Sequence, residues 1–592
     1  MAIIIIVVTL FTLGRPGTPK LSGEPVSFDG TRAAADLRTL VEQFPLRVAG
    51  SDPDNRAAIW VDQQFKQAGL ETHIEGFPAT VNGKEVALQN VWAVSPGESQ
   101  GSILLIANRD TPPLATQGAN DNGSGTATLL ELARAFTVTA HDHDIIFLCT
   151  SGDALGALGA RRFAQDHRTD RLYAAIALRK VATPDSSGVG VDGWSTAGKS
   201  APPWLWLLAA PAARVSANSE ALLPTAASQV MRLAVPASSG NQEPFVAAGV
   251  PAVSISAAGV MVPVQTDTLD YVSTETLNKV GATVQAMVLA IDGTASPGPR
   301  SGGTIFLTRQ RTLPGGSLAV ILAALLLPLA AVTVDLYAHC RRARVLLRPA
   351  LVRTALHLAP WLALIAIVYV ANLLGQLPRS PDAVIPPDSR LVDDPRYLRV
   401  VALAVLLLLA YVYAVAVGRR VERRIPTDPR ATIFIAHAVL VAISLLALTI
   451  HPYAVLMVLP AALLWPLARP GGWMRSIVPA YLGLLMIPVA LAYYALRLDI
   501  GWKVWWYFFL LFENRTVPAA AVLLGAFFLS AAGVLAHAMH ERGLAPGALS
   551  WPAVERRGSD RIDDDVWAAR ADVELGRTRH GSRARRQGSS RH

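Results

Sequence analysis

One turn of the chain holds the residues best placed to do chemistry. Residues 118–136 read GANDNGSGTATLLELARAF, a glycine-rich turn that carries one carboxylate, Asp121, and continues into an amphipathic stretch. The spacing of the apolar residues after the turn predicts a helix. We therefore take this turn as the leading candidate for a functional site.

Polar residues also follow a hydrophobic run. Residues 102–107 predict a buried strand that ends in a polar cluster with Asn108 and Asp110, and residues 145–150 predict a second strand. In an open α/β sheet, ligands bind at the carboxyl ends of the strands. These side chains are therefore candidates for the same site as Asp121.

Other residue patterns fit catalysis less well. Residues 141–144 read HDHD; alternating His side chains can bind a metal, but a polar run just before a strand is typical of a solvated turn, which we expect. Ser124, Ser151 and Ser238 have no evident His partner. No nucleophilic triad can be assembled from them.

The composition indicates two regions that position these residues differently. Hydrophobic residues make up 52% of the 592 residues, which is high for a wholly soluble chain, and they are concentrated in the second half. We expect a signal or signal-anchor segment at 1–20 that is the end of a longer helix, an α/β domain at 25–295, a linker at 296–316, a transmembrane region of about seven helices at 317–538, and a basic tail, largely disordered, at 539–592.

The apolar runs and the arginine clusters predict the topology. The expected spans lie at 317–334, 355–375, 400–417, 432–450, 453–468, 477–496 and 517–538, and the aromatic stretch at 505–512 is too short to cross. Arginines cluster at 341–353, at 419–424 and in the tail. The positive-inside rule therefore predicts an extracytoplasmic α/β domain and a cytoplasmic C-terminus. Seven lysines against many arginines suggest a GC-rich bacterium and its plasma membrane.

The net charge of +9 does not indicate nucleic-acid binding, because the charge lies beside apolar spans and not on a folded basic module. We expect no nucleic-acid partner. Two cysteines, Cys149 and Cys340, cannot form a disulfide framework and are expected to be inert thiols.

Several segments, in the family's order, resemble the M28 family of zinc aminopeptidases and carboxypeptidases over about residues 30–292. The first ones are PLRVAGS at 45–51, LQNVWAV at 88–94, GSILLIANRDTPP at 101–113 and the turn of Asp121. They are followed by the strand IIFLCT at 145–150, SGDALGALGARRF at 151–163, the strand YAAIALRKV at 173–181, SSGNQEPFVAAGVPAVSIS at 238–256 and VQTDTLDYVSTETLNKVGA at 264–282. The arrangement with membrane helices after the domain resembles the vacuolar membrane protease and endoplasmic-reticulum metallopeptidase types. The resemblance implies an α/β fold, a mixed-sheet three-layer zinc-exopeptidase-like domain, followed by an α-helical transmembrane bundle.

In that family two zinc ions share a bridging Asp, each also held by a His and a carboxylate, and a Glu is the general base. The resemblance places the bridging Asp at Asp121 and retains, as Asp110, the Asp that supports the first His. The remaining positions are substituted: the first His falls on Asn108, the general base on Asp153, and the other ligands on Ala154, Arg179 and Gln242.

These substitutions imply a degenerate zinc site, and we expect the Arg179 guanidinium to pair with Asp121 or Asp153 where a cation would sit. The favoured interpretation is a membrane-anchored pseudo-peptidase without a cofactor, whose outer domain binds a peptide or protein partner. The alternatives are an active membrane zinc metallopeptidase with aminopeptidase-type proteolysis and a transporter with an accessory outer domain.

Overall fold

The computed structural model describes residues 1–540 apart from 82–83, 168, 260–263, 295–297, 378–384, 388, 390, 395, 400, 403–404, 406–426, 469–472 and 515. The expected basic tail, from 541, and almost all of the expected span at 400–417 with its basic neighbour lie outside these residues. Residues 1–540 form one compact unit.

An eight-stranded mixed sheet forms the centre of the first region. Its strand order is β1-β2-β4-β3-β5-β8-β6-β7, and β3, β4, β5 and β8 are mutually parallel where they pair. The strands are β1 Glu71–Val81, β2 Lys84–Ser95, β3 Ser102–Asn108, β4 Asp144–Thr150, β5 Leu172–Leu178, β6 Gly188–Asp192, β7 Ala221–Leu222 and β8 Ala252–Ala258. The strands expected at 88–94, 102–107 and 145–150 are present. Residues of β3, β4 and β5 are almost all buried, as their unbroken apolar runs predict.

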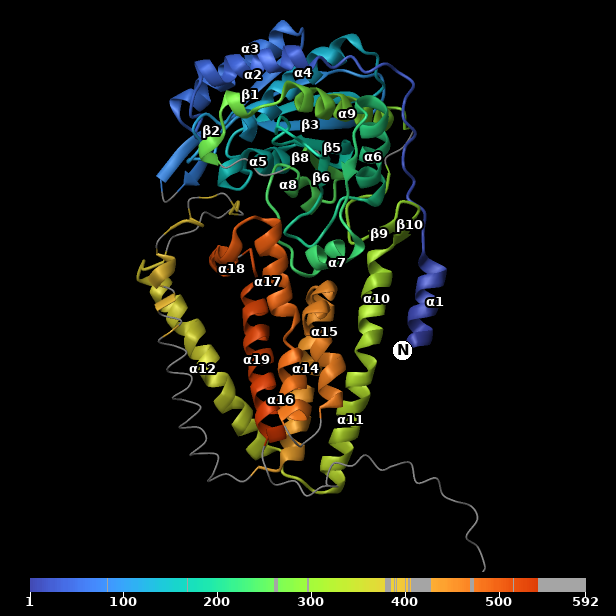
Figure 1. The fold of residues 1–592 in the computed structure, drawn as a ribbon, viewed down its shortest axis with the longest axis vertical. Helices are drawn as coiled ribbons and strands as arrows, with labels where there is room; N and C mark the ends of the chain where they lie inside the picture. The colour runs from blue at the N-terminus through green and yellow to red at the C-terminus, as the bar shows by residue number, and fades with distance from the viewer. Residues whose placement is uncertain are drawn as a thin grey trace, which may run out of the picture. The chain divides into compact units, whose positions relative to one another are not determined.

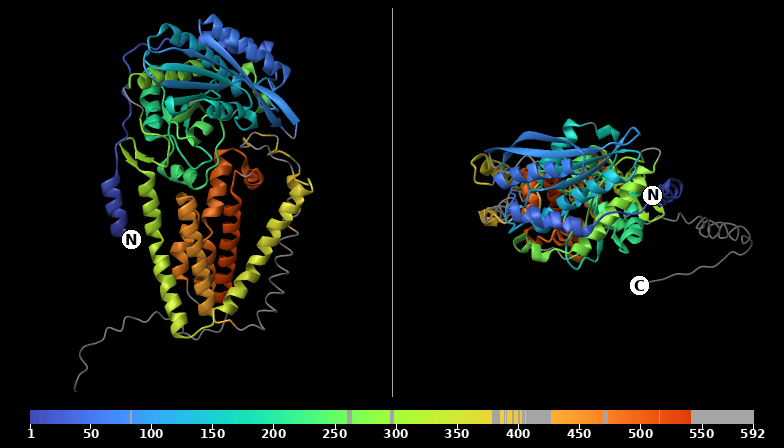
Figure 2. Two further views of the ribbon diagram at one scale, coloured as in Figure 1. Left: turned by 180° about the vertical axis from the view of Figure 1, so that it is seen from behind. Right: turned by 90° about the horizontal axis from the view of Figure 1, so that it is seen from above.

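Helices cover both faces of this sheet, which gives the expected three layers. Figures 1 and 2 show α2 (Gly30–Gln43), α3 (Asp52–Gln67), α4 (Ser124–Val138) and α9 (Thr274–Asp292) on one face. The short helices α5 (Leu158–Asp166) and α8 (Glu243–Ala247) lie on the other face. Helix α6 (Pro203–Ala217) packs beside α9, and α7 (Ala226–Ala234) lies next to the segment at 305–308. Side-chain caps start several of these helices: Ser51 accepts from the backbone N–H of Asp54, and Ser273 from that of Thr276.

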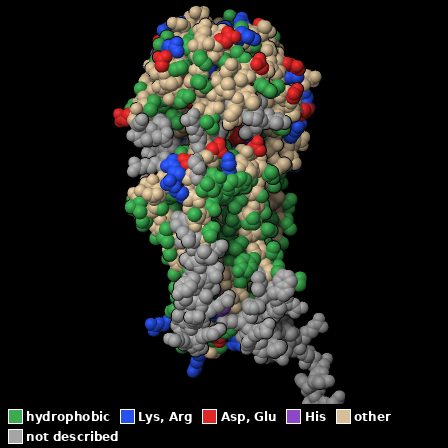
Figure 3. Space-filling model, turned by 60° about the vertical axis from the view of Figure 1, so that its left-hand side comes forward, with side chains coloured by type: hydrophobic (Ala, Val, Ile, Leu, Met, Phe, Trp, Pro, Cys, Tyr) green, Lys and Arg blue, Asp and Glu red, His purple; other side chains and the backbone are tan. Residues whose placement is uncertain are grey.

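The second region is helical, and among its described residues four helices are long and apolar enough to cross a membrane. They span Gly315–Arg342 (α10, Gly315–Leu325, with α11, Leu327–Arg342), Arg348–Leu373 (α12), Pro429–Ile450 (α14) and Ala519–Met539 (within α19, Ala519–His540). In the space-filling view, hydrophobic side chains dominate the visible face of this region, while charged side chains gather on the α/β region (Figure 3).

The other expected spans differ in the structure. The run at 453–468 forms α15 (Val455–Leu464) between two short turns, and the run at 477–496 is divided into α16 (Trp473–Leu482) and α17 (Met486–Arg497). Pro460 and Pro479 lie inside these helices, where proline removes a backbone hydrogen bond. The aromatic stretch forms the ten-residue helix α18 (Val504–Glu513), too short to cross, as expected.

Two further elements lie in segments expected to be a signal and a linker. Residues Ala2–Thr12 form the apolar helix α1, and the expected linker at 296–316 contains the hairpin of β9 (Ile305–Thr308) and β10 (Arg311–Leu313). Gly14 pairs with Thr312 through two backbone hydrogen bonds of 3.0 Å. The hairpin therefore joins the end of α1 to the start of α10.

Side chains of the helical region contact the α/β region around α7. Tyr493 bonds Ser228 at 2.6 Å, the Tyr494 hydroxyl donates to the carbonyl of Val235, and His451 Nε2 lies 2.6 Å from the carbonyl of Leu233. The two regions are thus joined by hydrogen bonds as well as by the chain.

Candidate functional site

The candidate residues meet at the carboxyl edge of the parallel strands. β3 ends at Asn108, β4 at Thr150 and β5 at Leu178, and these strands are neighbours in register. The loops that follow carry Asp110, Asp153 and Arg179. Asp121 lies in the turn before α4, whose backbone passes the same edge. Parallel pairing therefore brings together residues up to about 70 positions apart in sequence.

Asp121 faces two cations at this edge. The ammonium of Lys180 lies 2.9 Å from Asp121 Oδ2, and Nε of Arg179 lies 4.0 Å from Oδ1. Burial favours the neutral carboxylic acid, but the Lys180 and Arg179 charges outweigh it and hold the pKa of Asp121 below its usual value. The expected Arg179 partner is confirmed only at the limit of an ion pair, and Lys180 makes the shorter contact.

Lys180 has a backbone conformation that few lysines adopt. Its φ is +51°, in the left-handed region that disfavours residues with a Cβ. Its backbone N–H donates to Asn122 Oδ1 at 3.0 Å. The turn after β5 is therefore fixed to the Asp121 turn on both sides of the ion pair.

Asn108 belongs to a network of amide side chains. Its Oδ1 accepts hydrogen bonds from Nδ2 of Asn122 at 3.0 Å and from Nδ2 of Asn241 at 3.2 Å. Its own Nδ2 donates to the backbone oxygen of Asp110 at 3.1 Å. All three asparagines are at most 4% exposed, so these bonds satisfy amides that water does not reach.

Asp110 is fully buried and holds the turn that carries the next two candidates. Its carboxylate accepts from the backbone N–H groups of Asp153 and Ala154, each at 3.2 Å. Burial first, and then the nearby charges of Asp153 and Asp54, raise the pKa of Asp110 to about 7, although the two hydrogen bonds oppose this shift. This carboxyl therefore supports loop geometry at the edge of the site.

The remaining candidates lie nearby with different surroundings. Asp153, 6% exposed, and Ala154 form a short 3₁₀ turn with Leu155. Gln242 is 2% exposed and donates to the carbonyl of Ser239 at 3.3 Å, just before α8. The structure thus places every sequence-predicted site residue at or beside this edge.

Sequence reasoning missed four residues of the site. Three of them are direct sequence neighbours of predicted site residues, and this adjacency could have indicated them: Asn122, Asn241 and Lys180. Asp267 lies in the family-like segment at 264–282, 146 residues after Asp121, and accepts from the backbone N–H groups of Asn120 at 2.6 Å and Asp121 at 2.9 Å. Burial raises the pKa of Asp267, and the two backbone hydrogen bonds oppose that shift.

The Arg47 side chain binds the backbone next to the turn that carries Asp121. The side chain is fully buried and donates to the carbonyls of Gly118 at 2.8 Å and Arg109 at 2.8 Å. Burial lowers the pKa of Arg47 to about 10. It is the arginine of the PLRVAGS segment, so that segment serves the site by holding its backbone.

The HDHD run leads directly into β4 and is less solvated than expected, because His143 is only 4% exposed. His141 bonds Ser95 at 2.9 Å, and His143 Nδ1 lies 3.1 Å from Asp292 Oδ1. Across the described part of the chain, no group of three or more His, Cys, Asp or Glu side chains is placed to hold a metal ion. The three serines donate elsewhere: Ser124 to the carbonyl of Asn120, Ser151 to Asp54 and Ser238 to the carbonyl of Trp194.

Comparison with known proteins gives this site a family. The model of Peptidase family M28 matches residues 90–288. Among curated proteins, the chain is 31% identical over 161 residues to the alkaline phosphatase isozyme conversion protein of Escherichia coli, covering 24% of this chain and 46% of that protein. It is 30% identical over 110 residues to the BOS complex subunit ncln of Danio rerio, covering 16% and 19%.

The chain spans less than half the length of these curated relatives.

Among solved structures, an aminopeptidase from Aneurinibacillus sp. strain AM-1 aligns with 17% identity and a TM-score of 0.38, covering 46% of this chain and 96% of that one. The family match includes β3, the Asp121 turn, β5 and the loop before α8. Residues 90–288 of this chain therefore form a Peptidase family M28 domain.

Proposed function

We propose that this M28 domain is a pseudo-peptidase, attached to membrane helices, that binds a peptide or protein partner without hydrolysing it. The observation that carries the proposal is the Lys180 ammonium 2.9 Å from Asp121 Oδ2. A tethered cation next to the bridging carboxylate repels a zinc ion and satisfies the same negative charge.

The other residues at ligand positions do not fit zinc either. A catalytic zinc takes three protein ligands from imidazole, thiolate or carboxylate groups. Ala154 has no donor atom, and Arg179 is cationic. Asn108 Oδ1 already accepts two amide hydrogen bonds. Without a metal, no metal-bound water is present from which Asp153 could remove a proton. No hydrolytic step therefore follows from this arrangement.

The binding role is supported by a relative and by the exposure of the site's surroundings. One curated relative is, by its name, a subunit of a complex. Tyr271 is 52% exposed, four residues after Asp267, and is a large side chain that a partner could cover. The four apolar helices support a membrane location. The extracytoplasmic side and the bacterial plasma membrane are part of the same proposal.

Metal content and hydrolysis of the full chain test the pseudo-peptidase proposal. We expect substoichiometric zinc and no release of amino acids from aminoacyl or peptide substrates. The matched control is Asp121→Asn: hydrolysis that this variant leaves unchanged comes from a contaminating peptidase. Stoichiometric zinc and chelator-sensitive hydrolysis, both lost in Asp121→Asn, would establish the active metallopeptidase instead.

The binding role is tested by photo-crosslinking in cells from a benzoylphenylalanine placed at position 271. The control position is 215, where Val215 on α6 is 74% exposed. We expect a discrete cross-linked product from position 271 only. Products of equal intensity from both positions, or none from either, contradict a partner at this site.

A further inference from the structure

A basic surface lies where the α/β region meets the first membrane helix. The tip of the β9–β10 hairpin carries Arg309, Gln310 and Arg311, all exposed. The backbone pairing of Gly14 with Thr312 brings exposed Arg15 to the same place. Within the described residues, none of these three arginines has an ion pair with a carboxylate.

The distance of this surface from the hydrocarbon is limited by the chain. Arg311 precedes the first residue of α10 by four positions, and Arg15 follows the last residue of α1 by three. Four residues span at most about 14 Å, and the polar headgroup layer of a bilayer is on the order of 5–7 Å thick on each side. Long arginine side chains can therefore reach the headgroups from this position.

The exposed side chains of helix α1 also indicate that the membrane surface lies close to the hairpin. It packs beside α10, and Ile3, Ile6, Leu10 and Phe11 on it are 55–84% exposed. Large apolar side chains with this exposure are stable when lipid covers them. The apolar helices α1 and α10 thus both end next to the hairpin.

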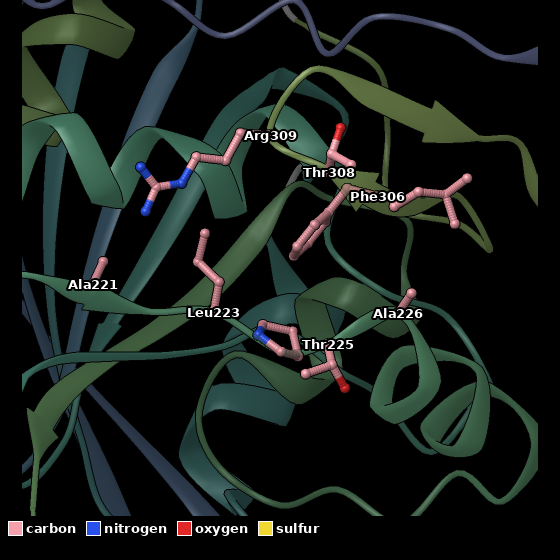
Figure 4. A pocket seen from close by; sticks show the side chains of 9 residues that line it. Ala221, Leu223, Thr225, Ala226, Phe306, Thr308 and Arg309 are labelled. Atoms are coloured by element: carbon pink, nitrogen blue, oxygen red, sulfur yellow. The ribbon is translucent and has the colours of Figure 1, made fainter.

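A cavity of about 350 Å³ adjoins Arg309. It is lined by Ala221, Leu223, Thr225 and Ala226 on one side and by Phe306, Thr308 and Arg309 on the other. Figure 4 shows the Arg309 side chain extending over Leu223 towards Ala221. The cavity combines a guanidinium and hydroxyl groups with an apolar floor, which suits a charged group attached to a hydrocarbon chain.

We propose that Arg15, the β9–β10 hairpin and this cavity form a docking surface for acidic phospholipid headgroups of the membrane that α10 enters. Charge complementarity and continuity with the membrane helix select this occupant. An anionic membrane surface attracts juxtamembrane arginines, and the attraction fades within a Debye length. This docking would hold the α/β region against the bilayer.

The test uses the full chain in nanodiscs of phosphatidylcholine, with or without phosphatidylglycerol, and measures amide hydrogen exchange of residues 305–313 and 221–226. We expect exchange to slow by about fivefold or more with phosphatidylglycerol, the ratio expected for one arginine near an anionic surface, and the protection to disappear in high salt. Arg309→Gln combined with Arg311→Gln should abolish the difference.

The matched control is Arg38→Gln on α2, an exposed arginine distant from the hairpin in sequence, which should retain the full effect. Inorganic phosphate added to the phosphatidylcholine nanodiscs separates the sources of the anion: protection by phosphate alone identifies a free-anion site and overturns the lipid proposal. Equal exchange in both nanodiscs, or equal protection in the double variant, overturns it as well.

Discussion

Two ion pairs in the α/β region have opposite surroundings. Arg109 Nε lies 3.0 Å from Asp54 Oδ1 with both side chains fully buried, and Asp54 Oδ2 also accepts from Ser151 and from the backbone of Gly50. Asp121 and Lys180 are 9% and 23% exposed, and Lys180 has a positive φ.

The first pair supports the fold, whereas the second lies at the candidate site. The Arg109–Asp54 pair ties β3, β4 and α3 together, with hydrogen bonds to several backbone carbonyls. The Lys180–Asp121 pair is reached by solvent and depends on one strained residue. Strained backbone is often found at functional positions, and here it occurs at the residue whose ammonium lies 2.9 Å from Asp121 Oδ2.

The largest expected effect breaks the structural pair. Asp54→Asn keeps the side-chain shape but leaves the Arg109 charge buried without a counterion, so we expect a loss of about 3–5 kcal/mol in the free energy of unfolding. Pulse proteolysis of the full chain in detergent and urea measures it. The control is Asp52→Asn on the same helix, whose exposed pair with Arg56 should be worth at most about 0.5 kcal/mol. Similar losses in both variants would contradict the comparison.

A second prediction uses Asp110, whose pKa is raised to about 7 by burial and then by the charges of Asp153 and Asp54. The unfolded carboxyl loses its proton near pH 3.9, so between about pH 4 and 7 the native state binds more protons and stability falls as the pH rises. Asp110→Asn removes this dependence. Between pH 4 and 7, the free energy of unfolding of the variant should rise relative to that of the wild type by on the order of 3 kcal/mol. Parallel stability curves would show that Asp110 titrates normally.

The smallest effects distinguish the two cations next to Asp121. Lys180→Met should cost about 1–2 kcal/mol and Arg179→Met less than about 1 kcal/mol, because Lys180 is nearer and both are partly exposed. Double-mutant cycles with Asp121→Asn, measured by the same urea titrations, should give the larger coupling energy for Lys180. A larger coupling for Arg179 would restore the sequence-based assignment of the replacing charge.

Much of the domain could be predicted from the sequence, because its signals are local. Unbroken apolar runs identified β3 and β4, and the glycine-rich turn identified Asp121. The carboxyl ends of parallel strands meet at one edge, so Asn108, Asp153 and Arg179 could be grouped in advance. The membrane region was harder, since prolines and turns inside the apolar runs at 453–468 and 477–496 shorten helices that composition alone would extend.

By itself the sequence indicated the family, the strands at 102–107 and 145–150, and Asp121 as the leading candidate of the site. Only the tertiary structure decided the order of the strands in the sheet and showed that Lys180 makes a shorter contact with Asp121 than Arg179 does. It also decided the partners of Asn108 and Asp121, since Asn241 and Asp267 reach them from more than 130 residues away. Contacts of that range depend on how loops pack at a sheet edge, and no local pattern of residues encodes them.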